Sequence, residues 1–381
     1  MIGGMTAMLS VFIGVNYYIA WRLCQCVKPC FPRINITICS AGVCIVLILV
    51  MLSGFLRFLL PISEKVKHAL GWLGAYWMGI FIYLFLFFCA VDLLLWLGGL
   101  IKVVPVPVPS AFRQAATLTA LVFTACIVCY GTYHARQIRH VTYDISFGKD
   151  TLAEEMKLVL ISDLHLGAVG SEVRLTEIVN EINRLQPDLV CISGDIFDND
   201  YRAIEDPDAA AGLLQGITSK YGVYACLGNH DAGETAGEME KFLERSQVRA
   251  LYDESVVIDG RLVVTGRLDP SPIGGFDKRK RRSLEEVMAD VDTELPVVVL
   301  DHNPAGVDAY AGIADLILCG HTHKGQIFPG SLFTGMLFPV DYGYYRKNSD
   351  SPQVIVTSGV GTWGMPMRVG TDSEIVSIRL H

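Results

Sequence analysis

Five short apolar runs in the second half of this 381-residue chain end in the same way, and this regularity constrains the fold more than any other feature. Each run is followed within a few positions by Asp, Asn or His, mostly beside glycine. The runs span residues 158–161, 189–192, 223–227, 297–300 and 316–319. Short apolar runs bounded by glycine and polar residues are typical of buried strands, and residues 172–185 show helical periodicity between the first two runs. The pattern predicts an α/β domain.

The side chains that follow these runs are of the types that bind metals. In chain order they are Asp163, His165, Asp195, Asp198, Asn229, His230, Asp231, His302, His321 and His323. Ligands of open α/β sheets bind beyond the carboxyl ends of the strands. Carboxylate oxygens combined with imidazole nitrogens suit Mn, Fe, Zn or Co better than Ca or Mg. Each residue alone is equally well explained as part of a turn, but a strand needs none of them to be stable, so the full set favours a metal site.

Five motifs carry a resemblance to a known family. They are D-L-H at 163–165, G-D-I-F-D at 194–198, G-N-H-D at 228–231, H-N-P at 302–304 and G-H-T-H at 320–323. The set resembles the signature of the calcineurin-like metallophosphoesterases. The segments at 342–345 and 361–368 are similar to segments found in the bacterial membrane-associated branch of this family, which includes YaeI and YkuE. The resemblance covers residues 141–381 and implies an α/β (α+β) four-layer sandwich of two β-sheets flanked by helices.

The resemblance also implies two divalent metal ions and phosphoester hydrolysis by metal-activated water. The implied ligands are Asp163, His165 and His323 for one ion, Asn229, His302 and His321 for the other, and Asp195 as a bridge, with Mn favoured among Mn, Fe, Zn and Co. His230 would lie beside the metals and protonate the leaving group. Asp231 is expected either to orient His230 or to cap a helix. Asp198 is expected to support the site without binding metal.

Later segments of the second half offer residues for substrate binding. Trp363 and Arg368 are expected to line the substrate mouth, where Arg368 would pair with a phosphate. Core packing is the competing interpretation for Trp363. At 266–271, Leu268 replaces an acid of the family pattern, which weakens the case for a metal or substrate role of Asp269. The basic run at 278–282 is expected to be a solvated face, or to meet lipid headgroups or an anionic substrate.

The first half of the chain has the composition of a membrane region. Its apolar stretches each reach the roughly 20 residues that a helix needs to cross a bilayer. They are residues 2–21, 34–60, 70–101 and 111–133. We predict a transmembrane domain at 1–135, a connector with an edge strand at 136–155, and a catalytic domain at 156–381. The protein is therefore expected to be a multi-pass protein of the cell membrane with membrane lipids among its partners.

Charge separates the two halves. Residues 1–140 carry two acidic and ten basic side chains, and residues 141–381 carry 37 and 21, so the formal charges are +8 and −16. An acidic catalytic half is a poor partner for nucleic acid. Basic residues number six and five on the two sides of the membrane, which does not fix the orientation. The absence of a disulfide-like cysteine framework in the second half favours a cytoplasmic catalytic domain.

Two features of the membrane half have more than one interpretation. Asp92 lies inside the third apolar stretch, where it is expected either to serve a function or to form a hydrogen bond between packed helices. Cys24, Cys26 and Cys30 lack a fourth zinc ligand and are expected to be ordinary or palmitoylated thiols.

These features together predict a membrane-anchored dinuclear-metal phosphohydrolase. It would cleave a phosphodiester, pyrophosphate or phosphomonoester, most economically of a lipid-linked substrate because the site adjoins a bilayer. Soluble nucleotides rank second as substrates and nucleic acids third. A receptor or scaffold with a vestigial metal site is an alternative, although none of the ligand positions is lost. A transporter is a weaker alternative, because four membrane spans with one acidic residue make a poor transport pathway. The sequence gives no oligomeric state.

Overall fold

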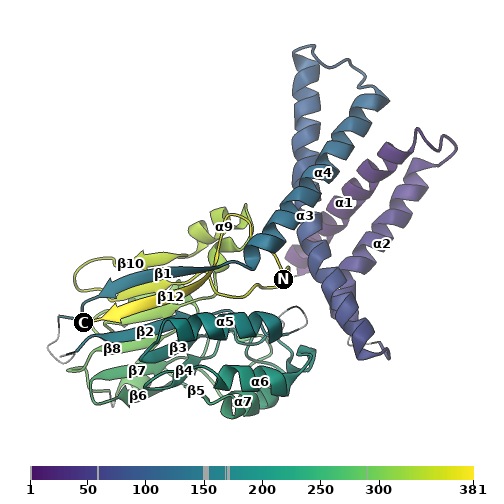
Figure 1. Cartoon of the computed structure of the whole chain (residues 1–381). Coiled ribbons are helices and arrows are strands. Elements are labelled where there is room, and N and C mark those ends of the chain that lie inside the picture. The colour runs from purple at the N-terminus through teal and green to yellow at the C-terminus, as the bar shows by residue number, and fades with distance from the viewer. Residues whose placement is uncertain (1, 58–59, 149–153, 168, 170–171, 290) are drawn as a thin grey trace. The chain divides into compact units, whose positions relative to one another are not determined.

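The computed structural model describes residues 2–57, 60–148, 154–167, 169, 172–289 and 291–381 (Figure 1). Its contacts divide the chain into two compact units. The first comprises Met1–Thr132 with Gly364–Pro366, and the second comprises Tyr133–Trp363 with Met367–His381. Each unit is described by itself.

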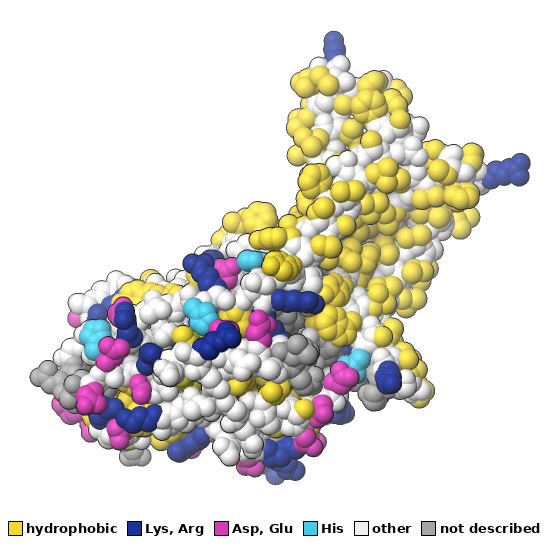
Figure 2. Space-filling model, viewed as in Figure 1, with side chains coloured by type: hydrophobic (Ala, Val, Ile, Leu, Met, Phe, Trp, Pro, Cys, Tyr) yellow, Lys and Arg dark blue, Asp and Glu magenta, His cyan; other side chains and the backbone are white. Residues whose placement is uncertain are grey.

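The first unit contains four long apolar helices, as predicted. They are α1 (Ile2–Val27), α2 (Ile36–Leu56), α3 (Glu64–Leu100) and α4 (Ser110–Ala135). All four are long and apolar enough to cross a membrane, with mean hydropathies of 1.3 to 2.7 in their most apolar windows. Figure 2 shows hydrophobic side chains over the surface of these helices, which is where a bilayer would cover them. Helix α1 continues past its apolar stretch to Val27, and α3 begins before its apolar stretch, at Glu64.

Asp92 joins two of these helices. Its carboxylate accepts a hydrogen bond of 2.5 Å from the Tyr18 hydroxyl of α1 and lies 3.3 Å from a guanidinium nitrogen of Arg22. These contacts favour the helix-packing interpretation of Asp92.

The sulfur of Cys24 lies 3.2 Å from that of Cys39, and no cysteine of the described residues belongs to a metal-type cluster.

The second unit is built on two six-stranded sheets. The first has the order β1 (Ile138–Ile145), β12 (Ser373–Leu380), β2 (Met156–Ile161), β3 (Leu189–Ser193), β4 (Val223–Cys226) and β5 (Val248–Ala250). The second has the order β10 (Gly343–Tyr345), β11 (Gln353–Val356), β9 (Leu316–Cys319), β8 (Val297–Leu300), β7 (Leu262–Gly266) and β6 (Glu254–Ile258). Strands β2 to β5 are parallel, as are β7, β8, β9 and β11.

Four layers form because each central strand is apolar on both faces. In β2, Leu158 and Leu160 pack between the sheets, whereas Val159 and Ile161 pack outward against helices. The outer face of the first sheet is covered by α5 (Glu172–Arg184), α6 (Pro207–Gln215) and α7 (Ala236–Arg245) (Figure 1). The outer face of the second is covered by α8 (Leu284–Met288) and the 3₁₀ helix η3 (Pro304–Tyr310). The predicted four-layer sandwich is confirmed.

The topology gathers the polar strand ends at one place in each sheet. Strands β2, β3 and β4 are parallel neighbours, and so are β8 and β9, so their carboxyl ends share an edge. Beyond β9 lie a 3₁₀ turn, η4 (His323–Gly325), and a short helix, α9 (Gly330–Leu337), which the sequence analysis did not anticipate. A further 3₁₀ turn, η2 (Tyr201–Ala203), follows β3.

Candidate metal centre

The loops after β2, β3 and β9 hold candidate metal ligands on strained backbone. Five of the seven predicted metal ligands have positive φ angles. They are Asp163 (56°), His165 (47°), Asp195 (50°), His321 (72°) and His323 (48°). A non-glycine residue in such a conformation costs about 1–3 kcal/mol and persists where the surroundings enforce it, commonly at functional sites. These backbone conformations therefore reduce the stability of the fold, and they direct the side chains toward a common point.

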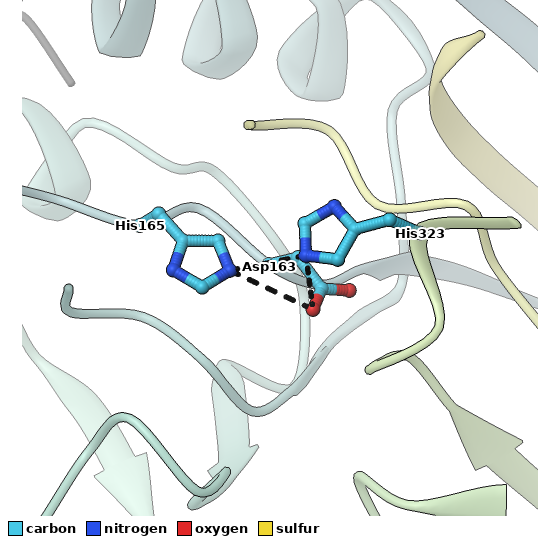
Figure 3. Close-up of side chains that lie close together, drawn as sticks. All are labelled: Asp163, His165 and His323. Atoms are coloured by element: carbon cyan, nitrogen blue, oxygen red, sulfur yellow. Dashed lines mark hydrogen bonds and ion pairs between the residues drawn. The ribbon is translucent and has the colours of Figure 1, made fainter. Parts of the chain in front are cut away.

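The first group of ligand atoms comes from Asp163, His165 and His323 (Figure 3). The Nε2 atom of His323 lies 3.3 Å from Oδ1 of Asp163 and 3.1 Å from Nε2 of His165. Oδ1 of Asp163 and Nε2 of His165 are 4.0 Å apart. Ligands placed about 2.1 Å from one ion in tetrahedral or octahedral geometry are separated by about 3.0–3.4 Å. The three atoms thus have nearly the separations that a shared cation requires.

The second group comes from Asn229, His302 and His321. Nδ1 of His321 lies 2.9 Å from Oδ1 of Asn229 and 3.2 Å from Nε2 of His302. The Nδ1 atom of His302 lies 2.7 Å from the Ser193 carbonyl oxygen. Because a carbonyl can only accept, Nδ1 donates this hydrogen bond, and Nε2 is the ring atom that faces the other candidate ligands.

Asp195 lies between the two groups. Its Oδ2 atom is 3.1 Å from Nε2 of His302 and 3.7 Å from Nε2 of His165. Its other oxygen accepts a hydrogen bond of 2.9 Å from the backbone N–H of His230, which fixes the carboxylate orientation. The structure thus brings all seven predicted ligand residues together, with one carboxylate oxygen facing both sets.

Two glycines allow the loops to approach this closely. A Cβ on Gly228 would lie 2.1 Å from Oδ1 of Asp195. A Cβ on Gly320 would lie 1.9 Å from the Ser162 hydroxyl and 2.5 Å from Oδ2 of Asp163. Any side chain at either position would displace a candidate ligand.

The electrostatics suit a cation. Burial raises the pKa of Asp163 and of Asp195, but the surrounding imidazoles outweigh it and hold both values below the usual range. Burial lowers the pKa of His165 to about 3 and that of His321 to about 4. Burial also lowers the pKa of His302, but Asp195 and Asp163 outweigh it and raise the value well above normal. Ionised carboxylates and neutral imidazoles are the forms that bind metals.

His230 faces a different carboxylate from the one expected. Its Nδ1 lies 3.9 Å from Oδ1 of Asp198, which also lies 3.8 Å from Nδ1 of His165. Asp231 instead accepts 2.8 Å hydrogen bonds from the N–H groups of Phe197 and Gly228. Asp231 therefore ties the loops after β3 and β4 together. Asp198 was expected to support the site, but its pairing with His230 depends on how one loop crosses another, which motif spacing does not encode.

A pocket of about 330 Å³ opens over the ligand groups. It is lined by His230, by five of the seven predicted ligands, by Gly330 and Thr334 of α9, and by Trp363. The Trp363 ring lies 6.0 Å from that of His230, and its backbone is held by two hydrogen bonds to Gln326. Trp363 thus lies at the pocket, and its role in substrate binding stays a prediction.

Arg368 does not line this pocket among the described residues. Its side chain is fully buried, and its Nη2 donates to the carbonyls of Ser358 (2.7 Å), Gly359 (3.1 Å) and Gly361 (2.7 Å). The expectation that Arg368 is free to pair with a phosphate is therefore corrected: its guanidinium braces the loop that packs against the Asp163 backbone.

Most side chains of the basic run at 278–282 form ion pairs or hydrogen bonds within the domain. Arg279 pairs with Glu240, and Arg281 pairs with Asp301. The Arg282 guanidinium donates to the backbone carbonyl of Glu286. These contacts explain most of the run without a lipid headgroup.

Asp269 makes a local contact at the end of the second sheet. It is buried, and one of its oxygens accepts a 2.7 Å hydrogen bond from the Ser271 backbone N–H. Asp269 does not belong to a metal-type cluster of the described residues.

The sandwich and its carboxylate- and histidine-lined pocket have the architecture of a metal-dependent phosphoester hydrolase. Comparison with known proteins agrees, since residues 156–325 match the family described as calcineurin-like phosphoesterase. A Danio rerio transmembrane protein with metallophosphoesterase domain is 30% identical over 360 residues, covering 88% of this chain and 79% of that protein. The chain belongs to the calcineurin-like metallophosphoesterase family.

Bacterial relatives match the second half of the chain. An uncharacterized metallophosphoesterase of Helicobacter pylori is 31% identical over 237 residues, covering 61% of this chain and 61% of that protein. YkuE of Bacillus subtilis, also an uncharacterized metallophosphoesterase, is 28% identical over 232 residues, covering 59% of this chain and 78% of that protein. The chain thus spans about three fifths of the Helicobacter relative.

Proposed function

We propose that this protein is a membrane-anchored phosphohydrolase that uses two divalent cations to cleave a phosphate ester or anhydride of a lipid-linked substrate. The observation that carries the proposal is the position of Asp195. One of its oxygens faces His165 of one ligand group and His302 of the other. Two cations held close together need such a shared anion between them.

The distances between the side chains support the proposed ligand sets. Asp163, His165 and His323 hold one cation, and Asn229, His302 and His321 hold the other. The mixed nitrogen and oxygen donors favour Mn, Fe, Zn or Co, with Mn preferred. When bound, such a pair of cations clamps a phosphate and lowers the pKa of water into the range of a usable nucleophile.

The protein's own side chains complete the site. His230 lines the pocket without belonging to either ligand set, so it is placed to donate a proton to the leaving oxygen. Burial lowers the pKa of His230, whereas the nearby Asp198 carboxylate favours the protonated ring, and Asp231 supports the loop that carries it. Trp363 offers an apolar wall beside His230 for the organic part of the substrate.

A lipid-linked substrate is supported by the chain's continuity. Helix α4 ends at Ala135 and β1 begins at Ile138, so a candidate membrane span leads directly into the unit that carries the site. We propose residues 1–135 as the membrane anchor, 136–155 as the connector and 156–381 as the catalytic domain, on the cytoplasmic side. The formal charge of −16 in residues 141–381 disfavours a nucleic-acid substrate.

The test is a substrate panel on the full chain in lipid nanodiscs, with Mn, Fe, Zn or Co supplied. The panel contains phosphatidic acid, a polyprenyl pyrophosphate, ATP and bis(p-nitrophenyl) phosphate. Hydrolysis of a lipid phosphate, together with two bound cations by elemental analysis, is the expected result. Hydrolysis of the soluble compounds alone would remove the lipid assignment, and absence of all hydrolysis would remove the enzymatic one.

A further inference from the structure

Helix α9 and the turn before it expose large apolar side chains to solvent. The exposed fractions are 52% for Phe328, 59% for Leu332, 61% for Phe333, 83% for Met336 and 75% for Leu337. We call these five residues the α9 apolar surface. Helix α9 has no buried residue, and residues 325–340 carry no charge although the domain around them is strongly acidic. Exposure of these apolar side chains to water is energetically unfavourable.

The inner side of the same helix lines the metal pocket. Gly330 and Thr334, four residues apart, contribute to the pocket wall. The Thr334 hydroxyl donates a 2.8 Å hydrogen bond to Asp341, and the ring of Phe338 lies 5.7 Å from that of His321. Helix α9 is therefore held in place by the site and presents its apolar side chains away from it. Figure 2 shows hydrophobic side chains where Figure 1 labels α9.

The rest of the chain indicates what covers this surface. Four helices of the same chain are candidate membrane spans. The last of them, α4, ends at Ala135, and β1 of the catalytic unit begins three residues later at Ile138. The unit that carries the α9 apolar surface is therefore covalently joined to a candidate membrane span. Phe and Leu side chains on an uncharged helical face are suited to the boundary between headgroups and acyl chains.

We propose that the α9 apolar surface inserts into the bilayer surface, so that the metal pocket opens toward lipid and receives a lipid phosphate ester directly from the leaflet. This inference rests on the proposed function and adds to it the element that recognises the membrane. The occupant is the lipid bilayer. A second copy of the chain on the same surface is the rival outcome of the test.

The direct test is photo-crosslinking in the full chain. p-Benzoylphenylalanine is placed at Phe333 or at Met336, and the protein is irradiated in nanodiscs of phosphatidylglycerol and phosphatidic acid. Val257 and Tyr344, which are 52% and 46% exposed in the sheets, are the matched control positions. Adducts of lipid mass at 333 and 336 but not at 257 or 344 are expected. Chain-to-chain adducts, or no lipid adduct at 333 and 336, would overturn the proposal.

A kinetic test connects the surface to the site. The double variant Leu332→Ser, Phe333→Ser is expected to hydrolyse phosphatidic acid in nanodiscs about tenfold more slowly, because it loses the apolar side chains that enter the lipid. Hydrolysis of bis(p-nitrophenyl) phosphate should be unchanged, as should both activities of Val257→Ser. An equal loss on both substrates, or none on either, would count against membrane docking.

The two proposals fail separately. If the wild-type protein hydrolyses no phosphoester, the proposed function is wrong, whereas the lipid adducts still decide whether α9 contacts the bilayer. If hydrolysis of lipid phosphates occurs but positions 333 and 336 give no lipid adduct, the function stands and the docking surface is wrong.

Discussion

At the residue scale, the site depends on Asp195 more than on any other side chain. Both of its oxygens are engaged, one by the His230 backbone and the other between His302 and His165. Its left-handed backbone and its contact with Gly228 leave the carboxylate little freedom. Removing its charge should therefore affect both cations at once.

We expect Asp195→Asn to reduce metal content and to lower kcat/KM by more than the roughly 10–100-fold that the loss of a supporting partner costs. Elemental analysis and hydrolysis of bis(p-nitrophenyl) phosphate measure the two effects. Asp277→Asn is the matched control, because Asp277 has a similar φ angle (53° against 50°) but is exposed. Full metal occupancy in Asp195→Asn would contradict the bridging role.

His230→Gln should separate proton donation from metal binding. We expect a loss of roughly 10²–10⁴-fold with an alkyl leaving group, which needs a proton, and a much smaller loss with p-nitrophenolate, which does not. Metal content should stay at the wild-type level because His230 is in neither ligand set. Equal losses with both leaving groups would argue against a general acid at this position.

Metal binding should release protons and weaken as pH falls. In the metal-free protein, burial lowers the pKa of His302, but Asp195 and Asp163 outweigh it and raise the pKa, which favours the protonated ring. The cations must displace that proton, and about one proton should be released on loading. Calorimetry in two buffers of different ionisation enthalpy measures it, and identical heats in both buffers would contradict the assignment of His302.

At the scale of secondary-structure elements, the strand ends were predictable and the way the elements meet was not. A strand buried on both faces gives a local apolar run, so β2, β3, β8 and β9 and the residues after them could be recognised from the sequence. The position of β12 between β1 and β2 leaves no local trace, because it joins segments that are distant in sequence. The enclosure of Arg368 likewise depends on a loop closing around it.

A buried ion pair next to the second sheet should contribute strongly to stability. Nε of Arg267, which follows β7, donates a 2.7 Å hydrogen bond to Asp253, and both side chains are at most 2% exposed. Asp253→Asn leaves the guanidinium charge uncompensated, so the free energy of unfolding should fall by about 3–5 kcal/mol. Thermal unfolding in detergent measures this fall.

The control for Asp253→Asn is Asp144→Asn, which breaks an exposed pair with Arg379. Solvent screens exposed pairs, so its unfolding temperature should hardly change. Equal shifts in the two variants would show that burial of the Asp253 pair is not what gives it its strength.

At the scale of the whole molecule, a unit of apolar helices and an acidic sandwich share one chain, and the family is shown by sequence across both. Residues 141–381 carry a formal charge of −16, and their three cysteines, Cys191, Cys226 and Cys319, are free and buried.

Protease treatment of membrane vesicles should reveal the side on which the sandwich lies. We expect an epitope at the carboxyl end to be digested in inverted vesicles and protected in right-side-out ones. After washing with alkaline carbonate, the full chain should remain in the membrane fraction. The opposite pattern of protection would place the catalytic unit outside.

Strand β1 continues from α4 and pairs in its sheet with β12, the strand nearest the carboxyl end of the sequence. During translation, β1 leaves the ribosome soon after the helices but waits without its partner until almost the whole sandwich has emerged. Until β12 is in place, β1 has no strand to pair with and the β2 edge of the sheet is open, and an open edge is prone to aggregation.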